Sequence, residues 1–194
     1  MNNIKSIFLI LITSLALFSC SVELSDYQKQ GAVFDIKKYF TGDVIAWGTV
    51  QDHTNKVNRM FCVEIKGTWQ GDKGVLAEKF YFKDGEVSFR NWQLTKQNNG
   101  HYIGTAEDVV GTAIGMHKGF AFQFQYELSL KVDDDIYLVS MDDWMYQLDE
   151  YRVMNKTSMS KFGIKVAEIN IFFDKEDTSK TCELFASGLP IETI

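Results

Sequence analysis

The residues best suited to chemistry in this sequence are acids that interrupt strand-like runs. Asp142 and Asp143 lie beside Trp144 in the run Ile136–Tyr146. Because neighbouring residues of a strand point to opposite faces, these two carboxyl groups cannot form a catalytic pair. One of the two is expected to face the interior, where a carboxylate requires an ion-pair or hydrogen-bond partner.

Two arginines lie where they could meet an inward acid. Arg90 shares a strand face with Trp92, and Arg59 shares one with Phe61. Such buried pairs often serve only to fix strand register, so a structural role competes here with a ligand-binding or catalytic one.

A second polar cluster is expected across the turn signal Asp84-Gly85. A two-residue loop at this point places Glu78 opposite Asn91, beside Phe80 and Phe89. Candidate ligand-binding residues combine such polar groups with aromatic side chains: Arg59, Glu78, Arg90, Trp92, Asp108, Phe122, Phe124, Tyr126, Asp142, Asp143 and Trp144.

Several familiar catalytic patterns are missing from the sequence. His53, His101 and His117 are scattered, and no Cys or His pair has the spacing of metal ligands. There is no G-x-S-x-G segment, and no glycine-rich phosphate loop precedes a helix. No catalytic residue, metal or cofactor is therefore predicted, and whether the protein is an enzyme stays open.

The first residues of the chain have the pattern of a secretory signal. Lys5 precedes an apolar run, and Leu17-Phe18-Ser19-Cys20 resembles a bacterial lipobox, in which Cys20 becomes the acylated first residue. An ordinary cleaved signal with a chance cysteine is the alternative. Ser21, rather than Asp, follows Cys20, which favours the periplasmic face of the outer membrane. The expected membrane attachment is through the acyl chains on Cys20, such as palmitate.

The charge of the chain argues against nucleic acid as a partner. Lys5 is the one charged residue before Cys20, so the remainder holds 19 of the 20 basic residues and all 26 acidic ones. A domain with this acidic balance and no basic tract lacks the electrostatic requirement for binding phosphate backbones. No protein partner can be predicted.

Two further cysteines raise the question of a disulfide. Cys62 and Cys182 remain once Cys20 is assigned to acylation. An oxidising compartment permits them to pair, but two separate buried thiols fit the sequence equally well.

The spacing of apolar residues predicts an all-β domain. Period-two alternation is clearest in Phe120–Val132, and comparable runs follow one another with short turns and no room for crossover helices. We expect an antiparallel, lipocalin-like barrel of about eight to ten strands, with a β-sandwich as the alternative. A short helix is expected in Val33–Phe40. The other predicted strands are Val44–Val50, Val57–Trp69, Val75–Phe82, Glu86–Leu94, Tyr102–Val110, Ile136–Tyr146, Tyr151–Met159 and Gly163–Phe173.

Many short motifs, in order, resemble an uncharacterised family of bacterial lipoproteins, domain of unknown function 3833. They are Phe40-x-Gly42, Ala46-Trp47-Gly48, Arg59-x-Phe61, Gly67-x-Trp69-x-Gly71, Leu76-x-Glu78-x-Phe80, Asp84-Gly85, Arg90-x-Trp92, Tyr102-x-Gly104-x-Ala106-x-Asp108-Val109-x-Gly111 and the run from Asp142 to Phe173. The resemblance implies a lipid-anchored envelope protein without an established activity. Cys62, Cys182 and the segment after Asp174 lie outside the family's pattern.

The chain is therefore divided into a signal peptide (1–19), a tether (20–32), a β-barrel domain (33–175) and a C-terminal tail (176–194). We expect a membrane-anchored envelope lipoprotein that binds or carries a lipid or another hydrophobic ligand. A structural or assembly lipoprotein that binds an envelope protein, and an enzyme acting on a lipid-like substrate, are the alternatives.

The anchor is tested by replacing Cys20 with Ala. Because the thiol is the expected acylation site, Cys20→Ala should lose incorporation of labelled palmitate, whereas Cys62→Ala should retain it. Label that persists in Cys20→Ala would refute the lipobox assignment.

Overall fold

The computed structural model describes residues 22–28, 31, 33–132 and 134–187. The predicted signal peptide (1–19) and the acylation site Cys20 lie outside these residues. No helix within the described part of the chain is long and apolar enough to cross a bilayer.

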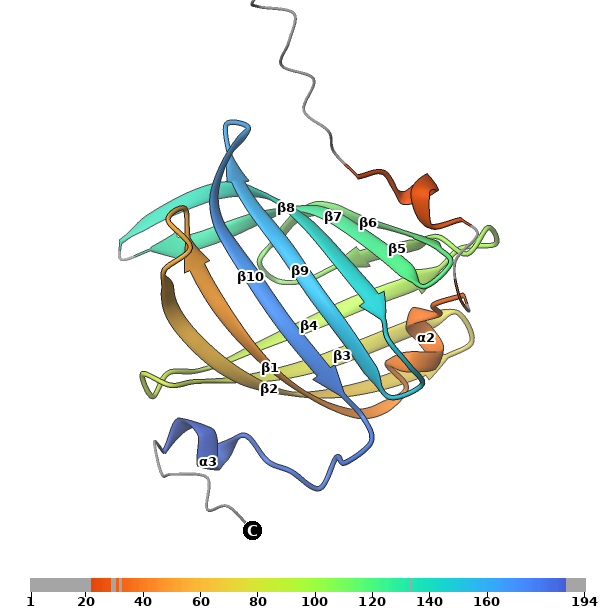
Figure 1. Ribbon diagram of the computed structural model, residues 1–194, viewed down its shortest axis with the longest axis horizontal. Coiled ribbons are helices and arrows are strands. Elements are labelled where there is room, and N and C mark those ends of the chain that lie inside the picture. The colour runs from red at the N-terminus through yellow and green to blue at the C-terminus, as the bar shows by residue number, and fades with distance from the viewer. Residues whose placement is uncertain (1–21, 29–30, 32, 133, 188–194) are drawn as a thin grey trace, which may run out of the picture.

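Ten antiparallel strands close into one barrel (Figure 1). Each strand pairs with its neighbours in the chain, and β1 pairs with β10, so the sheet closes on itself. This closure confirms the predicted barrel and excludes a sandwich. The strands are β1 (Gly42–Asp52), β2 (Val57–Gln70), β3 (Lys73–Phe82), β4 (Val87–Lys96), β5 (Tyr102–Thr105), β6 (Val109–Lys118), β7 (Ala121–Val132), β8 (Asp135–Gln147), β9 (Arg152–Lys161) and β10 (Ile164–Asp174).

A short segment before β1 plugs one end of the barrel. Asp35 caps α2 (Ile36–Tyr39) by accepting hydrogen bonds from Lys37 N and Lys38 N. The other oxygen of Asp35 accepts a 2.7 Å hydrogen bond from Lys96 Nζ, which ties the helix to β4. The apolar side chains of this plug join the barrel core: Phe34, Ile36, Tyr39 and Phe40. The opposite end of the barrel, which we call the mouth, has no such helix among the described residues (Figure 1).

The first described element, η1 (Leu24–Tyr27), packs on the outer wall near the plugged end. The ring of Tyr27 lies 5.3 Å from that of Phe120 and 5.7 Å from that of Tyr146. Part of the segment predicted to be a tether therefore contacts the barrel.

The strand predicted for Tyr102–Val110 is wrong, because the chain turns within it. β5 ends at Thr105, residues 106–108 form a loop, and β6 is a strand that the sequence did not reveal. Glycines hide the apolar alternation of β6. A Cβ on Gly115 would lie 2.5 Å from the ring of Phe122, so the missing side chain makes room for an aromatic ring of β7.

The register predicted across the β3–β4 turn is also wrong. Gly85 has φ of 92°, and Phe82 N bonds to Glu86 O, which makes a three-residue loop. Three-residue hairpins commonly end with a left-handed glycine. The extra loop residue shifts the pairing by one, so Glu78 lies opposite Arg90 instead of Asn91.

The C-terminal segment is fastened to the outer wall. A disulfide joins Cys62 on β2 to Cys182, which directly precedes α3 (Glu183–Ala186). Both cysteines are fully buried, in a cluster with Ile45 and Tyr81. All the described strands, the plug and both of these cysteines lie within residues 33–187, so the chain from Ser21 onward contains every element that the structure describes.

Loss of the disulfide is expected to destabilise the fold. The bond closes a loop with a sequence separation of 120 residues. The double substitution Cys62→Ala and Cys182→Ala should lower the free energy of unfolding by about 2–5 kcal/mol in urea titrations. A reductant should lower the stability of the wild type similarly and leave the double variant unchanged. A wild type insensitive to reductant would contradict the assignment.

Candidate functional site

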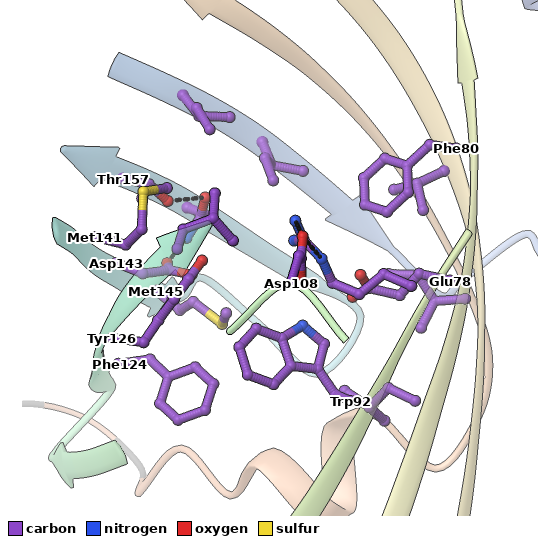
Figure 2. A pocket seen from close by; sticks show the side chains of 18 of the residues that line it. Glu78, Phe80, Trp92, Asp108, Phe124, Tyr126, Met141, Asp143, Met145 and Thr157 are labelled. Atoms are coloured by element: carbon purple, nitrogen blue, oxygen red, sulfur yellow. Dashed lines mark hydrogen bonds and ion pairs between the residues drawn. The ribbon is translucent and has the colours of Figure 1, made fainter. Parts of the chain in front are cut away.

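The barrel interior contains a cavity of about 530 Å³. This volume is in the range of small-molecule sites. Aromatic side chains from several strands form much of its wall, including Phe80, Trp92, Phe124 and Tyr126 (Figure 2). Polar side chains from β3, β4, β8 and β9 and from the β5–β6 loop also line the cavity. The mostly apolar chamber therefore contains a small polar region.

The first polar group of the cavity is centred on Arg90. Its Nε and Nη2 donate to one oxygen of Asp108, at 3.1 and 2.5 Å. The other oxygen, Oδ1, is buried and accepts no hydrogen bond from the described residues. Glu78 lies directly opposite Arg90 on β3, and its carboxyl group also borders the cavity. Arg90 is therefore flanked by two acids.

The Arg90–Asp108 pair also bridges a seam in the barrel wall. β5 pairs with β4 only over Gln93–Lys96, so the mouth half of β4 has no strand beside it on that side. Glu107 bonds to the backbone and side chain of Asn91, both at 3.1 Å. Side-chain contacts from the loop thus replace the missing strand contacts, and the same contacts place Asp108 in the cavity.

The second polar group contains Asp143, Asn155 and Thr157. Asn155 Nδ2 donates to Asp143 Oδ1, and Thr157 Oγ1 donates to Asn155 Oδ1 at 3.1 Å. All three side chains are buried. Figure 2 shows Asp143 and Thr157 on one side of the cavity and Glu78 on the other, with Asp108 between them.

The interior raises the pKa of two of these acids. Desolvation lifts the pKa of Asp143 from 3.8 to about 7, against the lowering effect of its bonds to Asn155 and Thr157. Desolvation likewise lifts the pKa of Glu78 from 4.5 to about 7, although Arg90 acts in the opposite direction. The cavity therefore holds two carboxyl groups that exchange protons near neutral pH.

Most of the candidate residues from the sequence line this cavity. They are Arg59, Glu78, Arg90, Trp92, Asp108, Phe122, Phe124, Tyr126 and Asp143. Asp142 and Trp144 do not, because their strand positions face outward; Trp144 Nε1 donates to Asp142 Oδ2 at 3.1 Å under the ring of Tyr27. Asp142 and Trp144 therefore do not belong to the cavity, unlike the other candidate residues.

The expected partner of the inward acid is also wrong. Asp143 is the inward acid, but it bonds to Asn155 and not to an arginine. Arg90 forms an ion pair with Asp108. Arg59 lies at the mouth and forms ion pairs with Asp84 and Glu86, each at 2.8 Å. Asn155 and Thr157 were missed, although the alternation of Val153 and Met159 around them would have placed both on the inward face.

The polar groups of this site can form hydrogen bonds and exchange protons with a bound molecule. The described residues lining the cavity include no His or Cys, so no histidine-activated nucleophile or thiolate is present among them. No cluster of three or more metal-ligating side chains occurs in the described ranges. An aromatic chamber with a few converging polar groups is typical of a site for an apolar ligand with a polar end.

A family model described as "Protein of unknown function (DUF3833)" matches residues 14–175. The chain belongs to this family. The match confirms the resemblance seen in the motifs, and Glu78, Arg90 and Asp108 are among the motif positions that border the cavity. Comparison with curated proteins finds no match.

Solved structures resemble the barrel at low sequence identity. The S-type phycobiliprotein lyase of Guillardia theta has a TM-score of 0.54 at 7% identity, covering 81% of this chain and 99% of the lyase. Apocrustacyanin C2 and lobster apocrustacyanin A1 have TM-scores of 0.41 and 0.40 at 11% and 12% identity, each covering 86% of this chain and 75% of the crustacyanin chain. The lyase comparison shows a shared fold alone, the lipocalin-like barrel that the sequence predicted.

The raised pKa values predict how stability depends on pH. Between about pH 4 and pH 7, folded Asp143 and Glu78 retain protons that the unfolded chain has released, so their contribution to stability falls as pH rises. Asp143→Asn removes one such group. The free energy of unfolding of this variant, measured relative to that of the wild type in urea titrations, should therefore increase as the pH rises above 4. At pH 8 the increase should be about 1–4 kcal/mol.

Asp142→Asn is the matched control for this experiment. It removes the neighbouring carboxyl group from the outer wall and keeps both cavity acids, so the fall in stability between about pH 4 and pH 7 should persist in this variant. A curve for Asp143→Asn that also ran parallel to the wild type would show that the Asp143 proton is not retained on folding.

Proposed function

We propose that this protein binds a lipid or similarly apolar molecule inside its barrel and is held at the cell envelope by acyl chains on Cys20. The observation that carries the proposal is the aromatic cavity of about 530 Å³ with its buried polar groups. A barrel needed only as a scaffold gains stability by filling its interior, because empty volume and buried acids both cost free energy.

The polar groups narrow the class of ligand. The chamber is lined by three acids, Glu78, Asp108 and Asp143, and by one deep cation, Arg90. Arg90 already forms an ion pair with Asp108. A ligand carboxylate placed among them would meet like charges, which raises the free energy of its ionised form. A neutral or cationic end that donates hydrogen bonds suits the open acceptor Asp108 Oδ1. We therefore favour a ligand with a hydroxyl, amide or amine end over a free fatty acid.

Attachment to the outer membrane supports a lipid as the ligand, because the barrel would then work where lipids are the commonest apolar molecules. This location rests on the lipobox-like segment before Ser21, not on the barrel itself.

The proposal is tested by titrating the chain from Ser21 onward with a fatty alcohol and a fatty acid of equal chain length. Trp92 borders the cavity, so tryptophan fluorescence should report saturable binding. The alcohol should bind more tightly at pH 8, and the difference should shrink as pH falls and the carboxyl groups gain protons.

Ser88→Phe fills part of the cavity without adding charge and should weaken binding at least about tenfold, or 1.4 kcal/mol. Ser140→Phe adds the same side chain to the outer wall and should leave binding unchanged. Absence of saturable binding by either ligand in the pH series would overturn the proposal.

A further inference from the structure

Exposed apolar side chains surround the mouth of the barrel. The β7–β8 and β3–β4 hairpins that carry several of them reach away from α2 (Figure 1). Exposure is 93% for Phe162, 73% for Ile136 and 70% for Phe89. All five hairpins at this end contribute to the set, which we call the apolar rim: Val57, Val87, Phe89, Val110, Val132, Ile136, Leu138, Phe162 and Ile164.

We propose that the apolar rim docks on the surface of a lipid bilayer, with the mouth of the barrel facing the lipid. The proposal rests on the proposed function, because docking would let an apolar ligand pass between bilayer and cavity without entering water. Single exposed apolar residues are ordinary on protein surfaces, but a set spread over every hairpin at one end is not.

Phe162 is the rim residue for which the fold gives the weakest structural reason, in either backbone conformation or packing. Phe162 and Gly163 form a two-residue turn, because Lys161 pairs with Ile164. Both turn residues have positive φ, 53° and 77°. Such a turn favours Asn-Gly, and a bulky side chain adopts this conformation at a steric cost. At 93% exposure, packing does not offset that cost, so the side chain is better suited to a contact outside the protein.

Lys161 and Arg59 are the charges beside the rim that fit a phospholipid surface, whereas the exposed acids Asp134 and Asp135 lie at the tip of the β7–β8 hairpin. Lys161 Nζ lies 4.0 Å from the ring centre of Tyr137 and 5.5 Å from that of Phe162, and no carboxylate of the described residues pairs with it. A lysine beside aromatic rings can keep its stem in apolar surroundings while its ammonium group reaches lipid phosphate. The rim acids Asp84 and Glu86 are engaged by Arg59, which limits their repulsion of phosphate.

The shape of the apolar rim favours a bilayer over a protein partner. Its members do not form one patch on a wall; they lie on five separate hairpins around the mouth, where Arg59 also borders the cavity. Phe89 belongs to both, since it is exposed at the rim and borders the cavity. A bilayer can contact separate hairpin tips at once and supply an apolar molecule to the opening between them.

The test is cosedimentation of the chain from Ser21 onward with phosphatidylcholine vesicles. The wild type should bind, and Phe162→Asn should weaken binding by roughly tenfold, since one phenylalanine leaves the apolar phase. Ile136→Ser should act in the same direction. Leu148→Ser removes an apolar side chain of 57% exposure from the plugged end and is the matched control. Phe162→Asn should also keep or raise the thermal unfolding midpoint, because Asn suits the turn.

Three outcomes would overturn docking: no vesicle binding by the wild type, equal loss in Leu148→Ser, or a lower unfolding midpoint in Phe162→Asn. A concentration-dependent dimer that Phe162→Asn abolishes, without vesicle binding, would assign the rim to a second copy of the chain instead.

The fatty-alcohol titration separates this proposal from the proposed function. Phe162 and Ile136 do not border the cavity, so both variants should bind the alcohol as the wild type does. Cavity binding without vesicle binding would remove docking alone. Vesicle binding without cavity binding would remove the proposed function.

Discussion

Pairing of the first strand with the last is the constraint on which the rest of this structure depends. β1 and β10 pair over eight residues of each strand, Ile45–Asp52 against Ala167–Asp174. Closure gives every inward position of ten strands a place on one internal surface. About eight strands already give an interior that side chains fill or that holds one small ligand. With ten strands, even large aromatic side chains leave space inside, and that space is the cavity.

The polar region within this space is also part of the wall. Because β5 is short, the loop that follows it folds against β4 and carries Asp108 to Arg90. One ion pair therefore links a structural seam to the interior of the site. A change in the cavity that weakened this pair would also weaken the contacts that join the loop to the wall beside the mouth.

Sequence reasoning succeeded where alternation was regular and failed where glycine replaced a side chain or lengthened a turn. The line of aromatic residues in β7 predicted both its strand and its inward face. Gly115 concealed β6, because its missing side chain is explained by Phe122 and Phe124 on the neighbouring strand. The pairing of Glu78 with Arg90 depended on the left-handed Gly85, and that of Asp143 with Asn155 depended on which strands become neighbours. Neither relation is contained in local spacing.

The position of η1 gives the molecule a direction. Its Tyr27 packs near the plugged end, and Val22 precedes this helix by two residues. An anchor at Cys20, two positions earlier still, would hold the plugged end near its own membrane and turn the mouth outward. The protein would then span part of the gap between two surfaces, fixed to one at its base and open to the other. In a two-membrane envelope, such polarity suits hand-over of lipid across the periplasm better than storage of lipid beside the anchoring leaflet.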